Sequence, residues 1–203
     1  AQEGTRVVVS GRTQAAVDAA VSALGAETGA SVQGFAGDLA TSAAADEAAA
    51  RFPEVDILVN NLGIFETCPF LDITDPDWQR FFETNVMSGV RLARAFLPHM
   101  QQRNWGRIIF ISSESAVQIP AEMIHYGTTK TAQLAVARGL AEAMAGTGIT
   151  VNSVLPGPTR SRGVEAFVQR MAQEQGKTFE ALEAGFFTQA RPSSLIKRFA
   201  RPQ

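Results

Sequence analysis

The chain of 203 residues is poor in several residue types, and each shortage excludes something. Its single cysteine, Cys68, cannot form a disulfide within the chain, which fits a reducing compartment such as the cytoplasm. Eighteen basic against twenty acidic residues give a formal net charge of −2, so no overall positive charge attracts nucleic acid. No apolar run is long enough to cross a bilayer, and the first residues lack the pattern of a signal peptide. We therefore expect a cytoplasmic globular protein that binds neither nucleic acid nor membranes.

Histidine is scarce as well. Neither His99 nor His125 has a cysteine, histidine or carboxylate neighbour at the spacing of metal ligands, so we expect no metal site. Both histidines are read as structural residues.

Short β-branched runs alternate along the chain with alanine-rich stretches of helical length. Strands are predicted at 6–11, 30–35, 56–61, 107–113 and 149–157, and helices at 13–28, 42–52, 75–103 and 123–146. Two further helical stretches, 163–174 and 178–187, follow without a strand. Several of the strands are apolar at almost every position, as strands covered on both faces are.

Strand followed by helix, repeated, predicts parallel βαβ units and an α/β fold: a Rossmann-type, doubly wound parallel sheet in three layers. The length suits one domain over residues 1–203. Ligands bind such sheets beyond the carboxyl ends of the strands. At those ends this sequence reads SGR, GDL, NNLG, ISSES and LPGPT.

Tyr126 is the only tyrosine, and Lys130 follows it at the spacing that places two side chains on one helix face. Lowering a phenol pKa from about 10 to about 7 requires roughly 4 kcal/mol. One ammonium about 4 Å away supplies roughly that amount at an effective dielectric of about 20. The spacing is therefore sufficient for a proton donor, although the same pair also occurs on ordinary amphipathic surfaces.

Two other positions could support Tyr126. The strand before its helix ends in Ser112 and Ser113, and a hydroxyl there could share a substrate oxygen with the phenol. Ser113 could equally be a turn former, and spacing does not exclude Ser115. Asn85 lies inside a long predicted helix, where asparagine is unfavourable, so it is either idle at the surface or holds a water or backbone group.

Together Asn85, Ser113, Tyr126 and Lys130, with NNLG and PGPT, resemble the short-chain dehydrogenase/reductase family, and most closely its 3-oxoacyl-acyl-carrier-protein-reductase-like members. The resemblance is clear over residues 4–160. It implies that Tyr126 exchanges a proton with the substrate oxygen and that Ser113 hydrogen-bonds that oxygen. It also implies that Lys130 binds the nicotinamide ribose and lowers the tyrosine pKa, while Asn85 anchors a water.

The resemblance also implies contacts with a nicotinamide cofactor, which supplies the hydride. Asn61 and Gly63 would lie along the cofactor, and Pro156, Gly157 and Thr159 would meet its nicotinamide end.

The stretch Ser10-Gly11-Arg12 lacks the acid that holds the ribose of NAD, and its guanidinium suits a 2′-phosphate, which favours NADP(H) over NAD(H). Arg12 could also be a solvated arginine. Asp38, followed by Leu39, resembles the aspartate beside the adenine or forms a turn.

The chain departs from the family at both ends. The first residues have no counterpart of the family's first strand and of the glycine-rich turn that follows it. Without that strand, we expect a gap in the centre of the sheet. The last strand also has no counterpart, so we expect the sequence to be a portion of a longer chain. Near the site, Leu62 replaces a usual alanine, and Glu114 stands where a small residue is commoner.

The expected activity is the NADP(H)-dependent interconversion of a small-molecule ketone or 3-oxoacyl thioester and its secondary alcohol. Alternatives are a nucleotide-binding sensor or scaffold without turnover, and an epimerase or dehydratase with the same tyrosine–lysine pair. Residues 158–190 are expected to form the substrate-binding lid, and 75–103 and 123–146 to join copies into homodimers or homotetramers.

Overall fold

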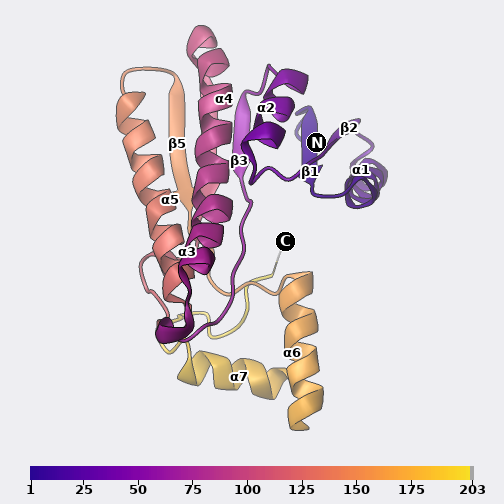
Figure 1. Ribbon diagram of the computed structural model, residues 1–203. Helices are drawn as coiled ribbons and strands as arrows, with labels where there is room; N and C mark the ends of the chain where they lie inside the picture. The colour runs from indigo at the N-terminus through magenta and orange to yellow at the C-terminus, as the bar shows by residue number, and fades with distance from the viewer. Residues whose placement is uncertain (202–203) are drawn as a thin grey trace. The chain divides into compact units, whose positions relative to one another are not determined.

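The computed structural model describes residues 1–201. It contains two compact units, Ala1–Val154 and Leu155–Gln203. The first unit holds the five strands and most of the helices (Figure 1).

All strand pairs of the first unit are parallel. β1 (Val7–Gly11) pairs with β2 (Val32–Ala36), starting at Val7 opposite Val32. A second sheet has the order β3-β4-β5, with bounds Ile57–Asn60, Gly106–Ile111 and Ile149–Val154. The predicted strands are confirmed within a few residues, and the expected gap is present, because no ladder joins the two sheets within residues 1–201.

The helices begin where capping residues predict. α1 (Gln14–Thr28), α2 (Ser42–Arg51) and α3 (Asp75–Phe82) each follow a threonine whose hydroxyl accepts a backbone N–H of the first turn. At α3, Thr74 and Asp77 form a complete capping box, and a proline follows in the first turn. α5 (Ile124–Ala143) completes the set predicted from sequence.

The predicted helix over 75–103 is interrupted. Between α3 and α4 (Ser88–Arg103) the backbone forms a π-turn over Glu83–Met87, with the Ser88 N–H bonded to the Glu83 carbonyl. Such single π-turns inside helices often mark functional sites. Asn85 lies buried at the middle of this turn.

α4 and α5 run side by side and cover one face of the three-stranded sheet (Figure 1). The core below them includes Leu58, Ile108, Phe110 and Val151 from the strands. Strand side chains outside this core are more exposed to solvent: Ile57 is 43% exposed, Val59 52% and Val154 47%. This differs from the burial on both faces that the apolar strand sequences predict.

The second unit is helical. α6 (Arg162–Gln175) and α7 (Phe179–Gln189) match the predicted stretches, and Val168, Phe187 and Phe199 form a small core with them. The parallel bridge between Thr159 and Ala200 ties the ends of this unit together.

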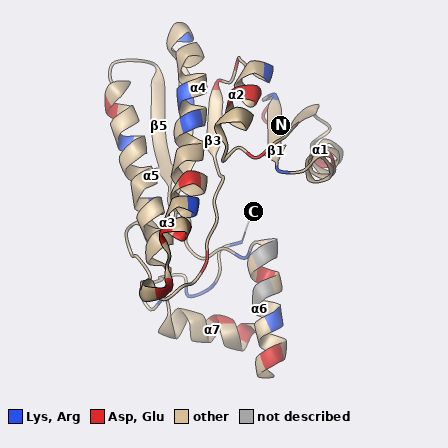
Figure 2. Ribbon diagram, in the orientation of Figure 1, with Lys and Arg blue, Asp and Glu red and all other residues tan. Residues whose placement is uncertain are grey.

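Charge differs between the two long helices: α4 carries arginines and no acidic residue, whereas α5 carries both basic and acidic residues (Figure 2). Within residues 1–201, every helix is too short or too polar to span a membrane.

Candidate active site

Ser113 and Tyr126 meet at the carboxyl end of β4. Ser113 follows that strand and caps the 3₁₀ turn Glu114–Ala116, its hydroxyl accepting the Ser115 N–H at 3.1 Å. The same hydroxyl hydrogen-bonds the phenol of Tyr126, which is half-buried in the first turn of α5. Ser112 instead donates to the Lys130 carbonyl at 2.8 Å, and Ser115 is buried. Of the three serines, Ser113 is the one that reaches the phenol.

Lys130 lies one turn further along α5 and is only 5% exposed. Its Nζ donates to the Ile111 carbonyl at 3.0 Å and to Gln133 Oε1 at 3.3 Å. It lies 5.7 Å from the centre of the Tyr126 ring. The predicted pair therefore shares one face of the helix, with the cation held by neutral oxygens.

Burial has the largest effect on the pKa of each member of the pair. Burial raises the pKa of Tyr126; the hydrogen bond from Ser113 acts to lower it, and the Glu114 carboxylate raises it. Burial also lowers the pKa of Lys130 to about 8. Burial is thus the largest cause acting on each group, and the expectation that Lys130 lowers the tyrosine pKa stays a prediction.

Asn85 joins the π-turn to the loop after β3 and to α5. Its Oδ1 accepts the Ile64 N–H at 2.8 Å, and its Nδ2 donates to the Ile64 carbonyl at 3.0 Å and to Thr129 Oγ1 at 2.9 Å. Thr129 in turn donates to the Tyr126 carbonyl at 2.7 Å. The amide thus sets the distance between three elements, and the expected water-anchoring role stays a prediction.

The backbone of Gly63 lies close to the side chains of Lys130 and Asn85. A Cβ added there would lie 3.4 Å from Lys130 Nζ and 3.5 Å from Asn85 Oδ1. Asn61, two residues earlier, is exposed after the end of β3. Leu62, between Asn61 and Gly63, packs partly against the main core. The side-chain bulk that leucine adds relative to the usual alanine therefore lies against the core.

The other expected cofactor residues of the first unit follow β1 and β2. Ser10 and Arg12 are exposed at the carboxyl end of β1. Asp38 accepts the Ala40 N–H at 3.1 Å, as a turn-forming aspartate does. The Leu39 side chain is buried in the main core, so only its backbone is available for a ligand. Gly37 N–H donates to the Gly11 carbonyl at 2.9 Å, which holds these two strand ends together.

Pro156, Gly157 and Thr159 belong to the second unit. Thr159 donates its hydroxyl to the Gly157 carbonyl at 2.9 Å, which makes this a compact turn. Their contacts with a nicotinamide stay a prediction from the family pattern.

The two histidines lie apart from this chemistry. His125 is buried against the Phe81 ring, with the centroids 4.0 Å apart, and burial lowers its pKa. His99 Nε2 lies 3.6 Å from Asp56 Oδ1, a carboxylate neighbour that sequence spacing did not reveal. Within residues 1–201, no three histidine, cysteine or acidic side chains gather as a metal site would require.

Sequence reasoning missed three residues of this site. Gln133 contacts Lys130, Thr129 links Asn85 to the helix, and the ring of Phe65 packs edge-on to Tyr126 at 6.4 Å. For Thr129 and Gln133 a signal existed: both are polar residues on the buried side of an alanine-rich helix. Phe65 lies in an irregular loop, where no periodicity could place it.

Comparison with known proteins decides the family. Residues 1–175 match the family described as short chain dehydrogenase. The chain belongs to the short-chain dehydrogenase family. Its match to the uncharacterized oxidoreductase YvaG of Bacillus subtilis is 44% identical and covers the whole chain and 77% of YvaG.

Other short-chain dehydrogenases resemble this chain over different lengths. The 3-oxoacyl-[acyl-carrier-protein] reductase FabG of Salmonella typhimurium is 39% identical over 53% of this chain and 44% of its own. Among solved structures, L-sorbose reductase of Gluconobacter frateurii, complexed with NADPH and L-sorbose, has a TM-score of 0.90. It is 30% identical and is matched over 99% of this chain and 77% of its own. The chain is therefore an oxidoreductase of the short-chain dehydrogenase family with a Rossmann-type fold.

Proposed function

We propose that this chain interconverts a carbonyl group and a secondary alcohol with NADP(H), using Tyr126 as the general acid and base. The observation that carries the proposal is the hydrogen bond between Ser113 and the Tyr126 phenol, with the Lys130 ammonium one helical turn away. A hydroxyl, a phenol and a cation converging at one strand end are the groups needed to hold and protonate a substrate oxygen.

Each side chain has a separate task in this proposal. In reduction, Tyr126 gives its phenolic proton to the carbonyl oxygen, and Ser113 hydrogen-bonds the same oxygen. The resulting tyrosinate is stabilised by the Lys130 cation, whose attraction grows as the phenolate charge develops. Oxidation runs these proton transfers in reverse. The cofactor supplies or accepts the hydride.

The residues present fit NADP(H). Gly63 offers a backbone without a side chain beside Lys130 and Asn85, as a close approach to a ribose requires. Arg12 is exposed at the end of β1, and the short stretch Ser10–Arg12 carries no carboxylate to repel a 2′-phosphate. L-sorbose reductase was solved with NADPH, which supports the same choice here. NAD(H) is the less favoured alternative.

We assign substrate binding in the first unit to the exposed apolar residues near Tyr126. Phe65 is 64% exposed beside the phenol, and Val117, in the segment between Ser113 and Tyr126, is 75% exposed. These residues favour a ketone or 3-oxoacyl thioester with an apolar portion. The lid role of 158–190 rests on the family pattern.

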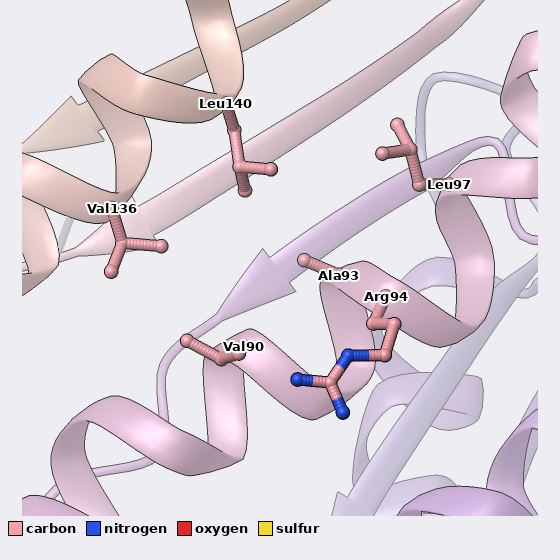
Figure 3. Close-up of a pocket in the computed structure, with 6 residues that line it drawn as sticks. All are labelled: Val90, Ala93, Arg94, Leu97, Val136 and Leu140. Atoms are coloured by element: carbon pink, nitrogen blue, oxygen red, sulfur yellow. The ribbon is translucent and has the colours of Figure 1, made fainter. Parts of the chain in front are cut away.

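We also propose that two copies associate through α4 and α5. A cavity of about 230 Å³ lies between these helices (Figure 3). Five apolar side chains and one arginine line it: Val90, Ala93, Arg94, Leu97, Val136 and Leu140. A second copy of the same helix pair is the occupant we assign, because its apolar side chains would complement this surface.

The decisive experiment for the activity replaces Tyr126 with Phe. Stopped-flow or steady-state assays with NADPH and a panel of ketones and 3-oxoacyl thioesters should show turnover reduced at least about 1,000-fold. NADPH binding, measured by calorimetry, should stay within about threefold, because the phenolic oxygen is not needed to hold the nucleotide. Turnover equal to wild type in Tyr126→Phe would disprove the role. NADPH binding by wild type without turnover of any substrate would favour the nucleotide-sensor alternative.

A further inference from the structure

Gln133 is a buried amide whose two ends are both occupied. It lies on α5, three residues beyond Lys130, and is 2% exposed. Its Nε2 donates to the Asn85 carbonyl at 2.5 Å, while its Oε1 accepts from Lys130 Nζ at 3.3 Å. Buried amides need such partners, but an apolar residue could fill this position without them. The amide therefore has a task besides packing.

The contacts of Lys130 show what that task is. An ammonium has three N–H donors, and the Ile111 carbonyl and Gln133 Oε1 take two of them. Both acceptors are fixed: one belongs to β4, and the other is held through its Nε2 to the π-turn. The remaining N–H is the one available to the side of Tyr126 and Gly63.

Among the residues whose side chains the structure describes, the other groups placed against Lys130 are uncharged. The loop after β3 contributes Gly63, β4 contributes the Ile111 carbonyl, and the π-turn contributes Asn85. On α5 the facing titratable group is Tyr126, and Glu114, from the 3₁₀ turn, acts on Tyr126. Burial alone lowers the pKa of Lys130 to about 8. The Gln133 oxygen at 3.3 Å is one of the two acceptors whose dipoles oppose this desolvation.

We propose that Gln133 is a positioning residue, whose amide fastens the Lys130 ammonium to the carbonyl of Asn85 in the π-turn. It holds the ammonium protonated and fixes its third N–H toward the tyrosine. Its effect on catalysis rests on the proposed function, whereas its effect on Lys130 does not.

The test measures the pKa of Lys130 directly, without turnover. The 203-residue chain is labelled with acetic anhydride across a pH series, and modification of the Lys130 peptide is quantified by mass spectrometry. In Gln133→Met, which keeps the length but loses the acceptor, the pKa of Lys130 should fall by about one unit. In Gln133→Glu, a carboxylate beside the ammonium should raise it by about one unit. Gln102→Met, on the exposed side of α4, is the matched control and should leave it unchanged.

Opposite shifts in the two variants would establish the role, because loss of packing alone cannot move the pKa in both directions. Shifts of the same sign, or none, would overturn it. Urea titration of each variant confirms that it is folded, and Gln133→Leu, which also lacks the acceptor, takes the place of Gln133→Met if that variant does not fold.

The catalytic consequence is measured separately. With an active carbonyl substrate, Gln133→Met should lower kcat about tenfold, leave the KM for the substrate within about twofold and move the loss of activity at alkaline pH about one unit lower. If labelling shows the opposite shifts but wild type reduces no carbonyl, the positioning role stands and the proposed function fails.

Discussion

Asn85 and Ile64 form a reciprocal pair: the Ile64 N–H donates to Asn85 Oδ1 at 2.8 Å, and Asn85 Nδ2 donates to the Ile64 carbonyl at 3.0 Å. The Asn85 side-chain amide thus forms with the Ile64 backbone the two hydrogen bonds that a neighbouring β-strand would otherwise form. Since Asn85 is 1% exposed, both partners would be left without hydrogen bonds if the amide were removed.

Replacing Asn85 with Ala should therefore destabilise the fold by about 2–4 kcal/mol, from three lost hydrogen bonds and the unsatisfied Ile64 backbone. The free energy of unfolding from urea titration measures this. Asn152→Ala, an exposed position on β5 with one long bond to Thr150, is the control and should change stability by at most about 0.5 kcal/mol. Equal effects of the two substitutions would contradict the bridging role of Asn85.

The single tyrosine makes a direct titration possible, because the near-ultraviolet absorbance of tyrosinate reports Tyr126 alone. Its pKa should lie above the ordinary value near 10, since burial favours the neutral phenol. Ser113→Ala removes a hydrogen bond that lowers the pKa and should raise it further. Glu114→Gln removes a negative charge and should lower it.

These opposite directions check the geometry of the site with no substrate present. A Tyr126 pKa that is unchanged in both variants would mean that Ser113 and Glu114 do not face the phenol. Val117→Ala, at an exposed neighbouring position without charge, serves as the control.

The proposed association through α4 and α5 predicts a change of molar mass. Val90→Asp places a charge in the apolar groove of Figure 3 and should convert oligomers to monomers in light scattering. The same substitution at Val117, which is 75% exposed and lies outside the groove, should leave the mass unchanged. A monomeric wild type would contradict the proposal at once.

Much of the fold could be predicted from the sequence. The alternation of β-branched runs with alanine-rich stretches predicts the strands and helices to within a few residues, because side-chain period and capping residues act locally. The interval between Ser113 and Tyr126, and the spacing of Lys130 behind it, could likewise be recognised from the sequence alone.

The remaining features depend on long-range contacts. Nothing local distinguishes the π-turn at Asn85 from a regular helix, since the turn is held by partners 21 and 44 residues away. The same holds for Gln133, whose donor–acceptor bridge needs Asn85 to lie 48 residues back in the chain but beside it in space.

The sequence by itself determined which candidate catalytic side chains this protein has and on which helices, strands and loops they lie. Only the tertiary structure decided their electrostatic state. Packing α5 against β4 and the π-turn removes Tyr126 and Lys130 from water, which raises the pKa of the phenol and lowers that of the ammonium. Desolvation depends on every neighbour at once, and no spacing along a chain encodes it.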